Sequence, residues 1–295
     1  MKFAGELAAL ATSACWTASS LCFALAGARV GSLAVNIIRL SLAFAGFVVL
    51  GLVLQGEALP FSATPAAWFW LSLSGLVGFF FGDLFLFRAL IEIGPRLSML
   101  IMALAPPLTA LGGWLTLDEK LTGLNLLGMA VTLAGVMWVV TETPEHGTRH
   151  TFTWRGGWLA FGGCLGQAAG VLLAKPGLAG VPSPFAATQI RLVTGLVCFL
   201  ALGAALGWYP QVRKGLRDRR ALAQISLGAL AGPFLGVSLL LFAITRIPTG
   251  PAQTFASLAP VMIIPFSAWL YHERITWRAL AGAVLAFAGI VLLFH

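Results

Sequence analysis

The sequence predicts an all-α membrane protein with ten transmembrane helices, built as two inverted repeats of five helices. Three observations predict this fold class. The 295 residues are 59% hydrophobic and only 9% charged, whereas a soluble domain carries about 25% charged residues. Ten apolar segments are long enough to cross a bilayer, and many residues recur at a fixed offset along the chain. A chain of this composition cannot cover itself with polar surface, so lipid is its expected solvent.

The apolar segments set the number of helices. A helix needs roughly 20 mostly apolar residues to cross a hydrocarbon core of about 30 Å. Ten segments meet this requirement: 5–27, 33–54, 67–92, 97–117, 121–141, 157–175, 185–206, 222–245, 251–271 and 276–294. The first imitates a signal peptide, but its basic region is a single residue, Lys2, and Glu6 follows it. We therefore interpret it as a membrane helix.

An internal repeat organises the chain. With an offset of 154 residues, glycine, proline and glutamate recur without gaps from the third segment to the fifth. The pairs include Gly78 and Gly232, Gly82 and Gly236, Pro106 and Pro260, Glu119 and Glu273, Gly128 and Gly282, and Gly135 and Gly289. The longest polar stretch, 142–155, lies between the two copies. We therefore expect a first repeat over residues 1–145, a linker over 146–156 and a second repeat over 157–295.

The repeat also bears on function. Five helices are an odd number, so the two copies must cross the membrane in opposite directions. Inverted repeats recur in secondary transporters, whose substrate site lies near the middle of the bilayer between the repeats. The architecture therefore predicts a transporter by analogy with other folds.

The distribution of basic residues predicts an orientation. Loops between helices 1 and 2, 3 and 4, 5 and 6, 7 and 8, and 9 and 10 carry eleven Lys and Arg residues, against four on the opposite side. The positive-inside rule places the basic loops in the cytoplasm and both termini outside. The net charge of +8 then reflects loops that face anionic lipid, and we expect no nucleic-acid partner.

Asp83 is the sharpest candidate for a functional residue. It lies well inside segment 67–92, and its counterpart in the second repeat is Val237. A charged side chain within the bilayer costs at least about 2.5–3.5 kcal/mol, so it needs a reason. The functional interpretation is a carboxylate that binds a substrate ammonium group or a coupling proton. The structural alternative is a hydrogen bond between helices or an ion pair with an arginine.

Two arginines occupy equivalent positions in the repeats. Arg39 and Arg191 lie about two turns into segments 33–54 and 185–206. Such a pair could bind a carboxylate or phosphate from both sides of a cavity. Alternatively, each side chain reaches the nearer membrane interface or braces a neighbouring helix.

Uncharged side chains complete the candidate cavity. Trp16 lies on the first segment, and Gln167 holds about the same position in the second repeat. Gln253 and Ser257 are spaced by four residues on segment 251–271, and Met99 offers a flexible apolar contact on segment 97–117. Each residue alone is weak support, since many such groups only bond neighbouring helices.

Catalytic, metal and cofactor sites are not expected. The chain has no Gly-rich phosphate loop followed by Lys and Ser or Thr, which argues against ATP-driven transport. The four cysteines lie inside apolar runs without C-x-x-C spacing, so we interpret them as small core residues. Glu119 and Glu273 precede the last helix of each repeat, where a carboxylate complements the dipole of that helix. We expect the protein not to be an enzyme.

Two copies of a longer motif resemble the EamA domain. The first copy reads Leu104-Ala105-Pro106, Leu117-Asp118-Glu119-Lys120-Leu121 and Gly128 to Gly135, and the second Leu258-Ala259-Pro260, Glu273-Arg274-Ile275 and Gly282 to Gly289. EamA transporters belong to the drug/metabolite transporter superfamily. The resemblance spans essentially the whole chain. It implies ten helices in inverted repeats, with a central cavity walled mainly by helices 1, 3, 4, 6, 8 and 9. It also implies cytoplasmic termini, opposite to the charge count, so both orientations stay open.

Together these features predict a secondary transporter, most plainly an exporter, of small metabolites such as amino acids or related amphipathic solutes. It would act by alternating access across the plasma (inner) membrane. Its expected partners are a small-molecule substrate, membrane lipids and protons as a candidate coupling ion, and the chain would be a monomer or homodimer. A lipid or lipid-carrier translocase and, less favoured, an integral-membrane enzyme are the alternatives. The substrate is left open by the sequence.

Overall fold

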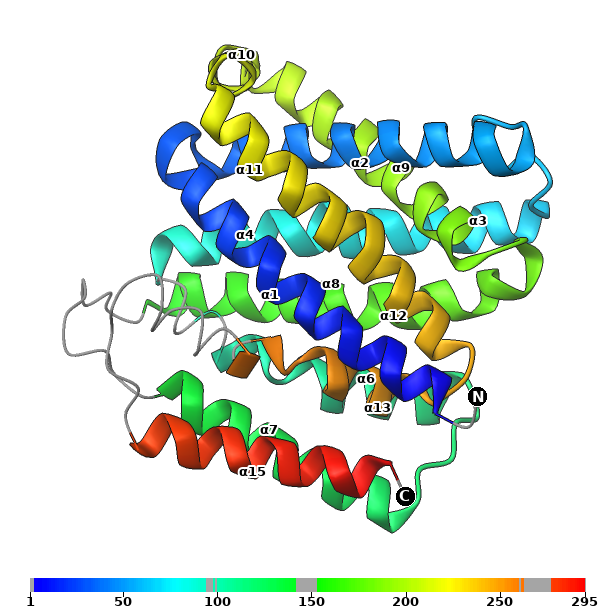
Figure 1. The fold of residues 1–295 in the computed structure, drawn as a ribbon, viewed down its shortest axis with the longest axis vertical. Helices are drawn as coiled ribbons and strands as arrows, with labels where there is room; N and C mark the ends of the chain where they lie inside the picture. Colours follow the sequence, from blue (N-terminus) through cyan, green and yellow to red (C-terminus); the bar gives the residue numbers. More distant parts are fainter. Residues whose placement is uncertain are drawn as a thin grey trace.

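A computed structural model describes residues 3–93, 98, 100–141, 153–259, 261–262 and 277–294. All regular structure in these ranges is helical (Figure 1). The elements are α1 (Ala4–Val30), α2 (Ser32–Gln55), α3 (Pro65–Ser74), η1 (Gly75–Gly82), α4 (Asp83–Glu92), α6 (Ala105–Thr116), α7 (Gly123–Thr141), α8 (Trp154–Gly177), η2 (Leu178–Gly180), α9 (Pro184–Ala205), α10 (Tyr209–Arg217), α11 (Arg219–Ala229), η3 (Leu230–Gly236), α12 (Val237–Ile244), α13 (Thr249–Ala256) and α15 (Trp277–Leu293). The predicted all-α class is therefore confirmed.

Several helices are long and apolar enough to cross a membrane, which makes the chain a multi-pass membrane protein. In the described ranges these are 4–27, 33–53, 65–89, 154–180, 184–205 and 219–244, six helices in all. Shorter apolar helices cover 100–116, 123–139 and 280–293. These nine stretches fall on nine of the ten expected segments. Much of the remaining one, 251–271, lies outside the described residues, so the count of ten stays a prediction.

The helices begin at residues that suit a helix start. Thr64 and Ser183 each accept a hydrogen bond from a backbone N–H of the first turn, and a proline follows each of them. Asp218 caps α11 in the same way and also pairs with Arg29 at the end of α1, 2.8 Å away. The backbone N–H of Ala221 and the Arg29 guanidinium hold the pKa of the Asp218 carboxyl below its usual range.

The sequence predicts a loop between segments 185–206 and 222–245, whereas the structure has a short, basic, amphipathic helix there, α10. Its charged side chains are exposed, whereas Gly215 on its other face is buried against Val30 and Ile38. A shallow hollow of about 480 Å³ is lined by Tyr209, Pro210, Arg213, Lys214 and Arg217. A helix of this kind is suited to lie along the membrane interface.

The third helix of each half contains a π-helical stretch at an equivalent place. Segment 67–92 runs through α3, η1 and α4, and segment 222–245 through α11, η3 and α12. Element η1 ends at Gly82 and η3 at Gly236, which differ by the repeat offset of 154. Pro233 lies inside η3, but Phe79 holds the equivalent place in η1, so the wide turn does not depend on proline.

The last helices of the two halves, α7 and α15, pack through reciprocal glycine contacts. A Cβ atom on Gly135 would lie 2.6 Å from the carbonyl oxygen of Gly282, and one on Gly289 would lie 2.7 Å from that of Gly128. An early residue of each helix therefore meets a late residue of the other, so the helices run antiparallel. The two contacts are equivalent, because the repeat offset of 154 converts Gly135 into Gly289 and Gly128 into Gly282. Such a reciprocal pair of contacts is what a two-fold axis produces.

The first helix of each half packs on the third helix of the other half. A Cβ atom on Gly166 of α8 would lie 2.6 Å from the Cα atom of Gly82 at the end of η1. In the opposite pairing, a Cβ atom on Gly236 would lie 3.0 Å from the indole ring of Trp16 on α1. Small residues let these backbones approach closely, as expected within a membrane. The two halves thus share their helix contacts rather than forming separate bundles.

The two ends of the bundle differ in charge. The rings of Phe3 and Phe294 lie 5.5 Å apart, so both chain ends meet at one end of the bundle, on the right in Figure 1. We call this the termini end. The opposite end holds the Arg29–Asp218 pair and a 3.7 Å contact between Arg155 and Glu92. We call it the basic end, because α10 and the start of α11 add Arg213, Lys214, Arg217, Arg219 and Arg220 there.

Candidate functional site

A small cluster of charged side chains lies inside the bundle. Asp83 is the first residue of α4, directly after the wide turn of η1. Its carboxylate pairs with the guanidinium of Arg39 on α2. Both side chains are largely buried, with exposed fractions of 20% and 11%. The arginine partner that the sequence left as one alternative for Asp83 is therefore present.

Aromatic rings enclose the guanidinium of Arg39. Its Cζ atom lies 5.4 Å from the ring centre of Phe23 on α1 and 5.3 Å from that of Phe87 on α4. Such contacts favour a desolvated cation. The side chain therefore turns into the bundle and does not reach out to the interface. Its pair with Asp83 connects α2 to α4, which agrees with the alternative that it braces a neighbouring helix. Its Nε atom is buried without a hydrogen-bond partner.

Arg191 contacts the same third helix of the first half, at η1. It lies on α9 and is only 5% exposed. Its guanidinium stacks 5.2 Å from the ring centre of Phe79 in η1, and its Nη2 atom fills the space over Gly78, 3.3 Å from where a Cβ atom would be. The Nε and Nη1 atoms are buried and have no hydrogen-bond partner. The structure thus brings Asp83, Arg39 and Arg191 around one wide turn.

Trp16 and Gln167 flank the two wide turns at equivalent places. Trp16 packs against Gly236, while the backbone nitrogen of Gln167 lies 3.5 Å from where a Cβ atom on Gly82 would be. Because Asp83 follows Gly82 directly, Gln167 lies beside the charged cluster. Trp16 lies at the corresponding place in the other half, next to the turn that Val237 follows.

The remaining predicted residues are less closely connected to the cluster. Gln253 on α13 is 3% exposed, and its Oε1 atom has no hydrogen-bond partner. Ser257 ends α13 and donates to the carbonyl oxygen of Thr254 at 2.8 Å, so its hydroxyl is satisfied within its own helix. Helix α13 packs against α1 and α6. Met99 lies outside the described residues.

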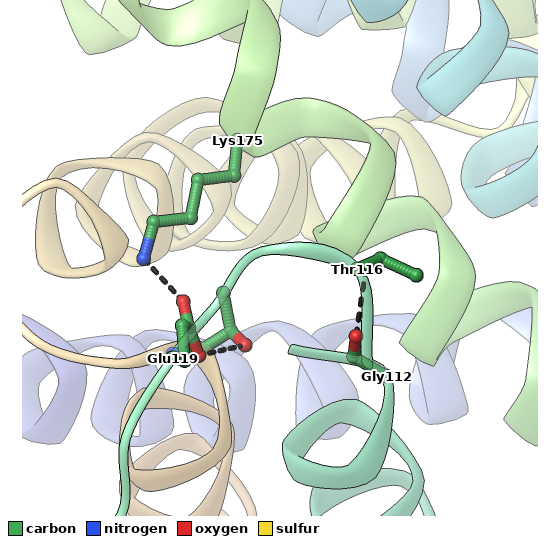
Figure 2. Close-up of polar contacts among 5 residues, drawn as sticks. Gly112, Thr116, Glu119 and Lys175 are labelled. Atoms are coloured by element: carbon green, nitrogen blue, oxygen red, sulfur yellow. Dashed lines mark hydrogen bonds and ion pairs between the residues drawn. The ribbon is translucent and has the colours of Figure 1, made fainter. Parts of the chain in front are cut away.

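A second polar cluster forms at the termini end (Figure 2). The carboxylate of Glu119 accepts hydrogen bonds from the backbone nitrogen and the hydroxyl of Thr249, both at 2.8 Å, and pairs with Lys175 of α8. Thr249 is the first residue of α13. Glu119 therefore has a structural role, as predicted, but its hydrogen bonds cap a helix of the second half and not the helix that follows it.

The backbone around Glu119 explains this difference. Asp118 has a left-handed φ of 52°, a conformation that aspartate tolerates better than most residues. This bend lets the backbone nitrogen of Glu119 bond back to the carbonyl oxygen of Gly113 at 3.2 Å. Gly113 also leaves room for the carboxylate, since a Cβ atom there would lie 2.5 Å from a Glu119 oxygen. A left-handed aspartate is not visible in a sequence pattern, which is why the contact was missed.

A hollow of about 520 Å³ lies beside Glu119. Its lining consists of Glu119, Lys175, Leu178, Ala179, Ile244, Thr245, Arg246, Ile247 and Pro248. These residues come from both halves of the chain, so the Glu119 cluster joins the halves at the termini end. Neither this hollow nor the one along α10 is lined by Asp83.

Metal chemistry finds no support in the described part of the chain. No group of three or more His, Cys, Asp or Glu side chains there could hold a metal ion. The four cysteines are free thiols, and Cys164 is fully buried between helices.

Comparison with known proteins identifies the family. A comparison with curated proteins found no match. One solved crystal structure is similar over 98% of this chain and 95% of its own, with a TM-score of 0.74 at 18% sequence identity, which shows a shared fold. The model of the EamA-like transporter family matches residues 3–141 and again residues 154–295. The chain therefore belongs to the EamA-like transporter family, within the drug/metabolite transporter superfamily.

Proposed function

We propose that the protein is a secondary transporter that moves small metabolites, such as amino acids or related amphipathic solutes, by alternating access. We further propose that it works as an exporter in the plasma (inner) membrane. The observation that carries the proposal is the buried cluster of Asp83, Arg39 and Arg191 at the wide turn of η1. Charges inside a membrane bundle mark the path of a solute or ion, because they cost too much to keep without a role.

The arrangement of the helices supports this mechanism. The proposal includes ten transmembrane helices in two inverted repeats, over residues 1–145 and 157–295. Helices α7 and α15 pack antiparallel, and the first helix of each half packs on the third helix of the other half. Both observations agree with a two-fold axis in the membrane plane. In such transporters one repeat moves against the other around a site near midplane.

Asp83 is the proposed coupling group. In the described state its carboxylate is paired with Arg39. A proton taken up by Asp83 would cancel that pair and free Arg39 to change its contacts. Proton uptake and release could therefore switch the wide turn between two arrangements, with Gln167 and Trp16 orienting the solute on either side.

Transport by reconstituted protein tests this proposal. Vesicles would be loaded with a labelled metabolite panel, and flux would be followed with and without a pH gradient. For a transported solute, Asp83→Asn should lower the flux driven by the gradient roughly tenfold or more, since a charge-assisted contact contributes about 1.5–3 kcal/mol. Exchange of the same solute across the membrane without a gradient should persist.

Asp218→Asn makes the same chemical change outside the membrane and serves as the control. Asparagine still caps a helix, so this variant should transport like the wild type. Unchanged gradient-driven flux in Asp83→Asn at every pH would refute the coupling role. Movement of labelled phospholipid between leaflets, with no solute flux, would instead favour a lipid translocase.

A further inference from the structure

We propose that the guanidinium of Arg191 binds the carboxylate of the transported solute. The substrate class is then an amphipathic organic anion with a single negative charge. This inference rests on the proposed transport function and specifies what its site binds. The structural basis is one unpaired guanidinium held inside the bundle beside a neutral ion pair.

The charges of the cluster do not balance. One carboxylate faces two guanidiniums: Asp83 pairs with Arg39 and also interacts electrostatically with Arg191, so the cluster carries one surplus positive charge. None of the ion pairs within the described residues involves Arg191. At 5% exposure water does not compensate its charge, and two of its three nitrogen atoms lack a hydrogen-bond partner. A buried guanidinium with free N–H groups matches the geometry of a carboxylate or phosphate.

The amount of surplus positive charge distinguishes a carboxylate ligand from a phosphate ligand. One unpaired positive charge is neutralised by one carboxylate. A phosphate group carries close to two negative charges at neutral pH and would leave the buried site negative. The second guanidinium is not free to help, because Arg39 already pairs with Asp83 and lies between two phenylalanine rings. The charge balance therefore points to a monoanion.

The side chains around Arg191 are apolar, which favours a solute that is apolar apart from its carboxylate. Its guanidinium lies against the ring of Phe79, which belongs to a core cluster with Phe47, Leu196 and Phe199. The side chains of this cluster are apolar and offer a hydrophilic solute no hydrogen bond. An anion with a ring or alkyl body would place its charge on Arg191 and its body among these side chains.

Thermal stability of the purified protein with four matched probes tests the inference. The probes are benzoate, its neutral analogue benzamide, the cation benzylamine and inorganic phosphate. Benzoate should raise the Tm of the wild type by about 1.5–2 °C once its concentration is about four to five times its Kd. The other three should have smaller effects or none. Arg191→Met should lose the response to benzoate, and Arg191→Lys should keep a weaker one.

The thermal stability of the variants without ligand provides a second measurement. If Arg191 serves a ligand, then without ligand the cluster holds one uncompensated positive charge, so Arg191→Met should be at least as stable as the wild type. Asp83→Asn should be the least stable variant, because it leaves two unpaired guanidiniums, and it should respond more strongly to benzoate. Failure of Arg191→Met to fold would overturn the proposal, since it would show a structural role.

Three further outcomes also count against the inference. A benzoate response that survives in Arg191→Met, a stronger response to phosphate, or a response to benzylamine alone would each overturn it. The proposed transport function can fail or stand separately. If the wild type moves a neutral or cationic solute but no carboxylate, transport stands and this inference falls.

Discussion

At the scale of single residues, the sequence singled out Asp83 and Glu119 but did not identify the side chains that they contact. Asp83 could be singled out because an acid in an apolar helix, without a counterpart in the other repeat, is conspicuous. Its pairing with Arg39 depends on how α2 lies against η1 and α4, and no spacing along the chain encodes that. Glu119 was predicted to be structural, but its true partner, Thr249, is 130 residues away in sequence.

Glu119 provides a residue-scale prediction about stability. Glu119→Gln removes the negative charge that faces Lys175 while it keeps an oxygen near Thr249. Because Lys175 is 29% exposed, we expect a moderate loss of about 1–3 kcal/mol, measured by thermal unfolding in detergent. Asp118→Gly is the neighbouring control. Glycine accepts the left-handed φ, so that variant should be as stable as the wild type or more so. Equal stability of all three proteins would contradict the role assigned to Glu119.

At the scale of helices, most elements could be predicted from hydropathy and from helix-start residues. Two features could not. The amphipathic helix α10 is short and strongly charged, so no apolar segment marks it. The π-helical stretches η1 and η3 have the composition of ordinary apolar helix, and only the three-dimensional path reveals their wider turns. Their glycines allow close packing of helices, as the contacts of Gly82 and Gly236 show.

Gly75 provides a prediction at the scale of helix packing. A Cβ atom there would lie 2.2 Å from the backbone carbonyl oxygen of Arg191, which cannot rotate away as a side chain could. Gly75→Ala should therefore push α9 from η1 and destabilise the protein by about 1–3 kcal/mol or more. Gly27→Ala on α1 is the control, since no atom lies within 4 Å of its Cβ position. A Gly75→Ala protein that melts like the control would show that α9 can shift freely.

At the scale of the whole molecule, the repeat was the most informative feature of the sequence. It predicted equivalent third helices, and both contain a wide turn that ends at glycine. It did not predict that first helices would cross over to the other half, because an offset relates equivalent residues without saying which of them touch. The charge difference between the two ends follows directly from the Lys and Arg count.

That charge difference yields a prediction about orientation. If the basic end faces the cytoplasm, single cysteines introduced into a protein without native cysteines should differ in labelling. Thr245→Cys, exposed at the termini end, should react with an impermeant maleimide on intact cells, whereas Gln211→Cys on α10 should react only after permeabilisation. The reverse pattern would place the termini in the cytoplasm, as the family resemblance implies.

The matched wide turns also record an order of events in the history of the chain. Both copies carry the π-helical stretch at the same offset, so the simplest account places its origin in the single ancestral half, before duplication. Asp83 stands immediately after one of these turns, and Val237 after the other. The charge difference therefore arose later, once two copies existed and could diverge. In this lineage the irregular helix therefore predates the chemical difference between the two copies.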